Sequence, residues 1–153
     1  MELKDRLRSD LTAAMKARDE LRTATLRMVL TAVQTEEVAG KTVRELTDAE
    51  VQAVLTREGK KRREAAAAFD GANRPELAAR ERAEEQVIAD YLPQQLGAEE
   101  LNEVVAEALT EAGLAGAGRD SMGAAMKAAN ARVAGRAEGG RVAAVVRRQL
   151  GLG

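Results

Sequence analysis

The sequence predicts an all-α protein that consists of two helical units. Apolar residues recur at the three- and four-residue spacing of helices along the chain, and no run alternates with the two-residue period of a strand. Alanine, a strong helix former, is abundant, whereas Phe69 and Tyr91 are the only aromatic residues. We therefore expect a core of Leu, Val, Met and Ala side chains between closely packed helices.

Residues 1–92 predict a four-helix unit, and the first two helices lie before Gly40. Asp19 is placed to cap the second helix, and Gly40 is placed to end it. The second helix is apolar over a wide arc, which predicts a central position. An apolar stripe marks the first helix: Leu3, Leu7, Leu11 and Met15.

The third and fourth helices have clear start signals. Thr47-Asp48-Ala49-Glu50 has the pattern of a capping box, in which a hydroxyl and a carboxylate each satisfy a free backbone N–H group. The third helix ends near Gly71. Pro75 suits the first turn of the fourth helix, and Leu92-Pro93 stops it because proline disfavours helical geometry in the preceding residue.

Residues 97–153 predict a small three-helix unit that follows a linker from Pro93 to Gly97. An amphipathic helix rich in glutamate comes first, and a flexible break from Gly113 to Gly118 ends it. A short helix starts at Asp120 or Ser121, where Ser121 is the expected cap, and a final helix ends at Gly151.

The composition excludes several kinds of chemistry. The chain has 153 residues and a net charge of −1, and it contains neither cysteine nor histidine. Thiol catalysis, zinc–thiolate sites and a histidine base are therefore excluded, and we expect no metal site, no cofactor and no catalytic residue. No segment resembles a signal peptide or a membrane helix, so we expect a cytoplasmic protein with no membrane partner.

The strongest functional signal is a basic C-terminal surface. From residue 115 onward, seven cations minus two acids leave a net charge of +5, and such a surface suits a polyanion. The alternative is a solvated polar face, in which the last cations offset the negative end of a helix dipole. The candidate RNA-contact residues are Lys127, Arg132, Arg136, Gly139, Gly140, Arg141, Arg147 and Arg148.

A second run of cations lies on the third helix, at Lys60, Lys61, Arg62 and Arg63. These residues are a possible second phosphate contact. Four consecutive residues spread over more than half of a helix circumference, however. We favour the alternative that they pair with acidic residues of the fourth helix: Glu76, Glu81, Glu84 and Glu85.

Several motifs resemble the GatB/YqeY family, and together they span nearly the whole chain. In the C-terminal part they are Leu92-Pro93-Gln94-Gln95-Leu96, Met122-Gly123-x-x-Met126-Lys127 and Gly135-Arg136-Ala137-Glu138-Gly139. Upstream, the resemblance to the free-standing YqeY-like branch rests on the Leu3/Leu7 start, Leu26-Arg27-Met28 and Lys60-Lys61-Arg62-Arg63-Glu64. The resemblance implies two all-helical domains. It also implies kinship with the tail of the B subunit of the tRNA-dependent amidotransferase, a carbon–nitrogen ligase that converts Glu-tRNA or Asp-tRNA with glutamine as amide donor.

On this basis the sequence predicts a tRNA-binding accessory module that acts in translation. The near absence of aromatic residues predicts recognition of folded RNA by backbone and shape rather than by base stacking. The expected partners are tRNA and an aminoacyl-tRNA amidotransferase or synthetase complex. The alternative is a protein–protein adaptor or an oligomerising scaffold without RNA binding. The wide apolar arc of the second helix favours this alternative.

Overall fold

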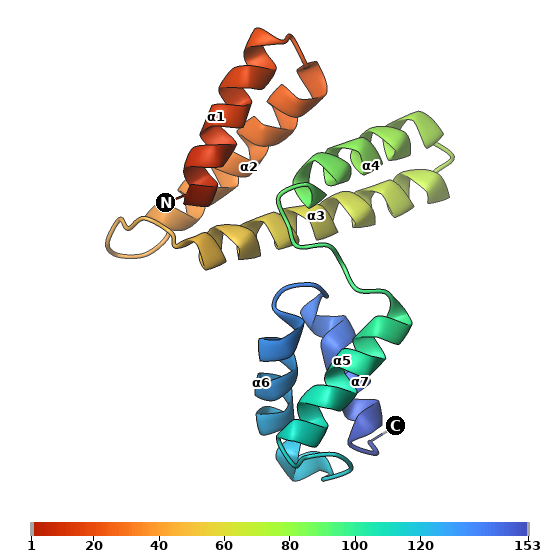
Figure 1. The fold of residues 1–153 in the computed structure, drawn as a ribbon. Coiled ribbons are helices and arrows are strands. Elements are labelled where there is room, and N and C mark those ends of the chain that lie inside the picture. The colour runs from red at the N-terminus through yellow and green to blue at the C-terminus, as the bar shows by residue number, and fades with distance from the viewer. Residues whose placement is uncertain (1, 153) are drawn as a thin grey trace. The chain divides into compact units, whose positions relative to one another are not determined.

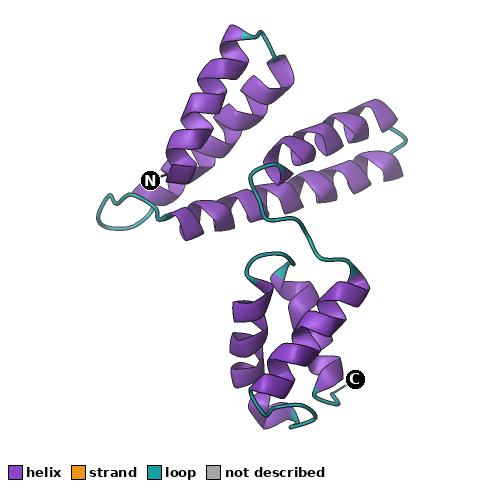
Figure 2. Cartoon of the chain, viewed as in Figure 1, coloured by secondary structure: helices purple, strands orange, loops and turns teal. Residues whose placement is uncertain are grey.

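Residues 2–152 are described by a computed structural model, in which they form seven α-helices and one short 3-10 helix (Figure 1). Within this range loops join the helices and no strand occurs (Figure 2), so the predicted all-α class is confirmed. The chain divides into two compact units, Met1–Leu92 and Pro93–Gly153.

The N-terminal unit consists of two helical hairpins. Helix α1 (Glu2–Lys16) pairs with α2 (Glu20–Val38), and α3 (Asp48–Gly71) pairs with α4 (Pro75–Ala89). Helix α2 also contacts α3 and α4, as its wide apolar arc predicts. Aliphatic side chains from all four helices fill the shared core, among them Leu7, Leu26, Val29, Val33, Val51, Leu55 and Ile88.

The predicted helix starts of this unit form as the sequence indicates. The Asp19 carboxylate accepts a hydrogen bond from the Arg22 backbone N–H at 3.1 Å. Thr47 and Glu50 make both hydrogen bonds of the capping box, and Pro75 is the first residue of α4. These starts depend on side chains within the first turn, which explains why sequence alone locates them.

The predicted end of α2 is confirmed, and that of α4 comes early. Helix α2 ends at Val38 with Ala39 as its C-cap, so Gly40 directly follows the cap. Helix α4 ends at Ala89, before Leu92-Pro93. Beyond this end, the N–H groups of Tyr91 and Leu92 bond to carbonyls three residues back, so the chain tightens before the proline is reached.

A buried ion pair holds the loop at residues 39–47 against α1 and α2. Lys4 Nζ lies 2.6 Å from a carboxylate oxygen of Glu37, and the two side chains are only 7% and 10% exposed. The same oxygen accepts a hydrogen bond from the Leu46 N–H at 3.1 Å. The hydrogen bond from Lys4, followed by the one from Leu46, lowers the pKa of the Glu37 carboxyl.

The C-terminal unit packs three helices around a core of its own. They are α5 (Ala98–Glu111), α6 (Met122–Val133) and α7 (Gly139–Gln149), with the 3-10 helix η1 (Arg119–Ser121) before α6. Ser121 precedes α6, but the prediction that its side chain caps this helix is wrong. Because η1 leads directly into α6, Ser121 has φ −95° and ψ 4° rather than the extended geometry of a capping residue.

Candidate nucleic-acid interface

The predicted contact surface covers the end of α6, the turn that follows it, and α7. Ala134 and Gly135 both have positive φ angles, 52° and 81°, and they turn the chain away from α6. Glu138 then begins α7 in extended geometry, with φ −66° and ψ 146°. The candidate cations along this path have very different surroundings.

The guanidinium group of Arg136 binds the C-terminal end of α6. Its Nε donates to the Val133 carbonyl at 2.9 Å, and a terminal nitrogen donates to the Arg132 carbonyl at 2.8 Å. Carbonyls at a helix end have no partner within the helix, and the helix dipole favours a cation there. Arg136 is half-buried, so its principal contribution within the chain is to hold this turn.

Leu96 connects the segment at residues 93–97 to the same turn. Its N–H donates to the Arg136 carbonyl at 2.7 Å, and its own carbonyl accepts a hydrogen bond from the Arg141 guanidinium at 3.0 Å. The Leu96 side chain is buried in the core of the C-terminal unit. The structure thus brings Arg136 and Arg141 together around Leu96, where both stabilise the fold.

Arg132 is directed toward α5 rather than outward. One terminal nitrogen lies 3.0 Å from the Glu107 carboxylate, and the other forms an ion pair with Glu111. The hydrogen bond from Arg132 lowers the pKa of the Glu111 carboxyl. Arg132 therefore neutralises acidic residues of its own unit. No local sequence pattern predicts this pairing, because the partners are more than twenty residues away in the chain.

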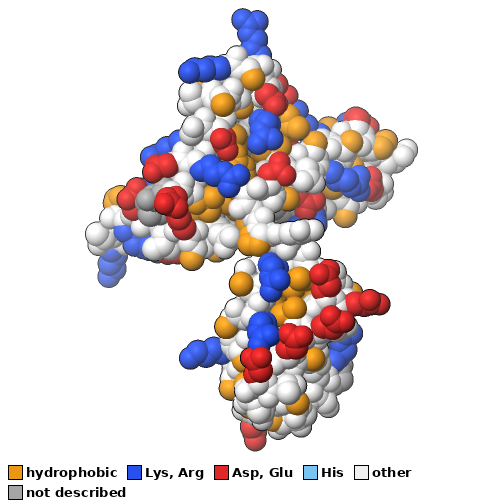
Figure 3. Space-filling model, in the orientation of Figure 1, with side chains coloured by type: hydrophobic (Ala, Val, Ile, Leu, Met, Phe, Trp, Pro, Cys, Tyr) orange, Lys and Arg blue, Asp and Glu red, His pale blue; other side chains and the backbone are white. Residues whose placement is uncertain are grey.

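Lys127, Arg147 and Arg148 are exposed and have no acidic partner in the described part of the chain, whereas Arg141 is exposed but bound to the Leu96 carbonyl. Within residues 2–152, the side chains of Lys127 and Arg147 make no hydrogen bond or ion pair. Arg148 reaches the Asn102 side chain on α5 at 3.4 Å, a long and weak contact. Figure 3 shows basic and acidic side chains next to one another on the visible face of this unit.

Gly139 and Gly140 form the first turn of α7. A Cβ atom added to either residue would meet no atom within 4 Å, and neither has a positive φ angle. The Glu138 side chain makes no capping hydrogen bond at this helix start. Backbone N–H groups of a first turn have no acceptor within the helix, so this end of α7 offers donors beside small residues.

The second cation run lies mainly against α4. Arg62 Nε is 3.3 Å from Glu81, and Arg63 is 2.6 Å from Glu85. Lys61 pairs with Glu58 of its own helix at 3.1 Å, and Lys60 is exposed. The pairing expected with the acids of α4 is present for Arg62 and Arg63, and an RNA contact through this run stays a prediction.

No group of three or more acidic side chains in residues 2–152 is arranged to hold a metal ion. In the same range, no helix is both long enough and apolar enough to cross a bilayer. Met122 and Met126 pack against the C-terminal core, as their spacing of one helical turn predicts.

Comparison with known protein families gives a match over almost the whole chain. The model of a family described as Yqey-like protein matches residues 4–150, a span that includes all of the candidate contact residues. A search of curated proteins finds no match to this chain.

Proposed function

The chain belongs to the Yqey-like protein family, and from this membership we propose that it is a tRNA-binding accessory module. The contact surface consists of the exposed cations of the C-terminal unit and the start of α7. The module is related to the tail of the B subunit of the tRNA-dependent amidotransferase, and it acts in the context of Glu-tRNA or Asp-tRNA amidation.

Gly139 and Gly140 are the observation that carries this proposal. Glycine weakens a helix relative to alanine, and at these two positions neither the backbone conformation nor the packing requires it. An RNA backbone that approaches the exposed N–H groups of α7 provides a reason for both glycines. Phosphate oxygens bind readily at such a helix start, where the donors and the helix dipole act together.

Three exposed cations provide the charge for the contact. Lys127, Arg147 and Arg148 have no acidic partner within residues 2–152, so phosphate contacts displace no internal ion pair at these positions. Arg132, Arg136 and Arg141 are engaged within the unit and act indirectly, because they hold α6 and α7 in place.

The bound RNA is a folded one that the protein recognises by backbone and shape. Recognition of single strands relies on bases that stack on aromatic side chains. Tyr91 is only 6% exposed and belongs to the N-terminal core. Phe69 is the one other aromatic residue of the chain, so a stacking platform of several rings is not available.

The amidation chemistry belongs to the proteins with which this module works. We propose a tRNA amidotransferase or synthetase complex as the partner, and no catalytic step by this chain alone. The chain contributes affinity and position, which are the properties of a basic binding surface rather than of a reaction centre.

The decisive experiment measures total tRNA binding by the wild-type chain and by Lys127→Glu/Arg147→Glu at several salt concentrations. Both side chains are exposed, so reversal of their charge is expected to leave the fold intact. We expect affinity to fall at least about tenfold, and the slope of log K against log salt to fall in magnitude by about 2, because two phosphate contacts are lost.

The matched control is Arg8→Glu/Arg27→Glu, which changes the net charge by the same amount on the N-terminal unit. Its tRNA affinity is expected to stay within about twofold of wild type, because long-range charge effects are screened at physiological salt. Equal binding by all three proteins, or binding without salt dependence, contradicts the proposed function.

A further inference from the structure

The cations of the N-terminal unit fall into two groups according to their partners. Those of α3 and α4 are mostly paired with carboxylates, for example Arg62 with Glu81 and Arg63 with Glu85. On α1, α2 and the turn between them, a second group forms no ion pair within residues 2–152, and it comprises Arg8, Lys16, Arg18 and Arg27. Lys41 and Lys60 also lack an ion pair, but they lie on other segments, the loop after α2 and helix α3.

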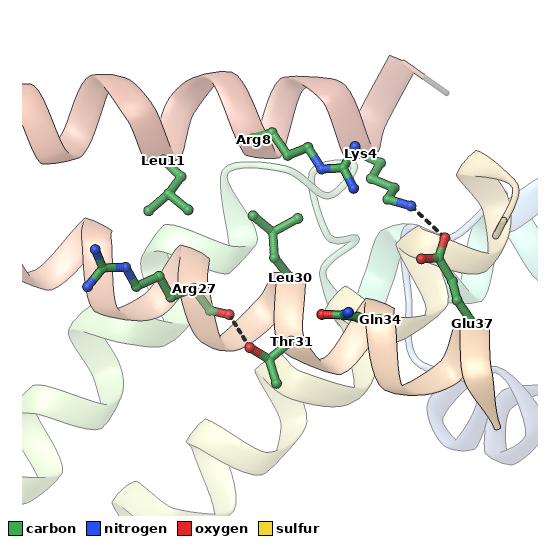
Figure 4. Close-up of a pocket in the computed structure, with 8 residues that line it drawn as sticks. All are labelled: Lys4, Arg8, Leu11, Arg27, Leu30, Thr31, Gln34 and Glu37. Atoms are coloured by element: carbon green, nitrogen blue, oxygen red, sulfur yellow. Dashed lines mark hydrogen bonds and ion pairs between the residues drawn. The ribbon is translucent and has the colours of Figure 1, made fainter.

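Arg8 and Arg27 lie on opposite walls of a groove between α1 and α2. The groove has a volume of about 450 Å³. Figure 4 shows Leu11 of α1 and Leu30 of α2 pointing toward each other between the helices. A second hollow shares Arg27 with this groove and continues along the hairpin to Met15 and Arg18. Both hollows are open to solvent, and we refer to them together as the α1–α2 channel.

The acidic residues that line this channel are already engaged. Glu37 accepts hydrogen bonds from Lys4 and from the Leu46 N–H. Glu20 accepts two hydrogen bonds from Arg80, at 2.8 and 3.0 Å. No carboxylate that lines the channel therefore forms an ion pair with the channel arginines, and their positive charge is not neutralised by direct contact.

The contacts that the channel arginines do make are weak. A terminal nitrogen of Arg27 lies 3.2 Å from the Met15 sulfur, which is a poor hydrogen-bond acceptor. Arg8 makes no side-chain hydrogen bond within residues 2–152, and Glu37 feels it only as a nearby charge. Both guanidinium groups retain donors for an external carboxylate.

Part of the channel floor is apolar, beside polar side chains such as Thr31 and Gln34. Leu11 and Leu30 are half-buried, and Met15 is 41% exposed. Phosphate groups would satisfy the arginines but would leave these side chains in water, and the channel has no aromatic ring on which a base could stack. A ligand that fits both features carries an apolar strip flanked by carboxylates.

We propose that the α1–α2 channel docks an acidic amphipathic helix of a partner protein. Apolar residues of that helix, spaced three and four apart, lie on the leucine floor, and its carboxylates pair with Arg8, Arg18 and Arg27. Arginine forms bidentate pairs with carboxylates, which fixes the register of such a helix. This docking is independent of RNA binding by the C-terminal unit.

Site-specific photocrosslinking of the full chain in cells tests the proposal. A benzophenone side chain replaces Thr31, an exposed groove residue whose hydroxyl bonds only to the Arg27 carbonyl. The control position is Thr56 on α3, which is also exposed and bonds only to the Gln52 carbonyl four residues back. Mass spectrometry then maps the crosslinked segment to individual residues.

We expect position 31 to crosslink a protein segment in which Asp or Glu flanks apolar residues at helical spacing, and position 56 not to recover it. Arg8→Glu/Arg27→Glu is expected to lower the yield at position 31 at least about tenfold, because like charges then face each other across the interface. Lys41→Glu/Lys60→Glu carries the same change in net charge and is expected to leave the yield unchanged.

The proposal is overturned if position 31 crosslinks RNA, crosslinks segments without an acidic excess, or gives no more product than position 56. It is also overturned if the Arg8→Glu/Arg27→Glu reversal leaves the yield unchanged or lowers tRNA affinity, since the latter assigns the channel to RNA. Circular dichroism establishes that each variant keeps its helical content. Arg8→Gln and Arg27→Gln, which remove charge without reversing it, decide the matter if the double reversal loses helix.

Discussion

The two units begin a helix with the same arrangement but secure it differently. Residues 46–51 lead into α3, and residues 96–101 lead into α5. In each segment a buried leucine precedes the N-cap, and a glutamate three residues after the cap accepts a hydrogen bond from the cap N–H, at 3.1 Å for α3 and 3.4 Å for α5. The next residue is apolar and joins the leucine in the core, as in a hydrophobic staple.

The difference lies in the cap residue and in what holds the leucine. Thr47 provides a hydroxyl that accepts from the Glu50 N–H at 3.2 Å, whereas Gly97 has no side chain to do so. In the N-terminal unit the leucine N–H binds the buried Glu37 carboxylate. In the C-terminal unit the Leu96 N–H binds the backbone carbonyl of Arg136, and the Leu96 carbonyl binds the Arg141 guanidinium. The comparison indicates that charged side chains near these two helix starts stabilise the fold through hydrogen bonds to the leucine backbone.

Removal of Lys4, which pairs with the Glu37 carboxylate that binds the Leu46 N–H, is expected to have the largest effect. Lys4→Met leaves the buried Glu37 carboxylate without its ion-pair partner, so we expect the N-terminal unit to lose about 3 kcal/mol of stability. Tyr91 is the only tyrosine, lies in that core and reports its unfolding by fluorescence in urea. Lys60→Met, at an exposed position without an ion pair, is the control. A similar loss in both variants contradicts the structural role of the buried pair.

The stability difference between wild type and Lys4→Met is expected to depend on pH. The folded state lowers the pKa of Glu37 below its ordinary value of 4.5, chiefly through Lys4. The stabilisation is therefore complete above that value and is lost as pH falls through the folded pKa. The stability difference between wild type and Lys4→Met should narrow below pH 4.5 in acid-titrated urea melts. A difference that stays constant to pH 3 would show that Lys4 acts by packing alone.

Removal of the Arg136 side chain, which binds the C-terminal end of α6, is expected to have the next largest effect. Arg136→Ala removes two side-chain hydrogen bonds to carbonyls at the end of α6, of which the Val133 carbonyl keeps the backbone N–H of residue 136, so we expect a loss of about 2 kcal/mol confined to the C-terminal unit. Hydrogen exchange should accelerate at residues 93–97 and 133–141 while the tyrosine-detected transition of the N-terminal unit stays in place. If exchange stays as slow as in wild type, Arg136 does not secure the turn.

Loss of the cap hydroxyl has a smaller effect. Thr47→Ala removes one of the two hydrogen bonds of the capping box, and we expect the N-terminal unit to lose about 1 kcal/mol. Thr56→Ala is the matched control, because its hydroxyl bonds only within α3 and caps nothing. Tyrosine-detected urea melts of the two variants separate the capping effect from the change in helix propensity, and equal midpoints would deny a capping role.

The sequence predicts the fold well because its signals are local. Apolar periodicity and the residues Asp19, Thr47 and Pro75 lie within the turns that they specify, so the all-α class and these helix starts are predicted correctly. The end of α4 and the role of Ser121 are not, because a tight final turn and a 3-10 entry depend on the surrounding packing.

The candidate site is predicted less well because its key contacts carry no sequence signature. Arg136 and Arg141 bind backbone carbonyls, which every residue possesses, so a cluster of arginines and glycines looks the same whether it faces a ligand or the chain. The sequence does not predict the unpaired cations of the channel at Arg8, for a related reason. Asp5 and Asp10 lie near Arg8 in sequence and make α1 look balanced, but Asp10 is directed to Tyr91 instead.

Addition of a cap hydroxyl at the second helix start is the smallest and most specific change. Gly97 has φ −72° and ψ 169°, the extended geometry in which serine caps helices, and a Cβ there would approach only Glu100 Oε1, at an ordinary 3.5 Å. We therefore expect Gly97→Ser to stabilise the C-terminal unit by a few tenths of a kcal/mol, about 0.3. Protection of the first-turn amides of α5 against hydrogen exchange measures the gain, and Gly97→Ala, which adds a Cβ without a hydroxyl, separates capping from backbone entropy. If alanine stabilises as much as serine, the gain comes from reduced backbone entropy in the unfolded chain, and a hydroxyl at position 97 does not cap α5.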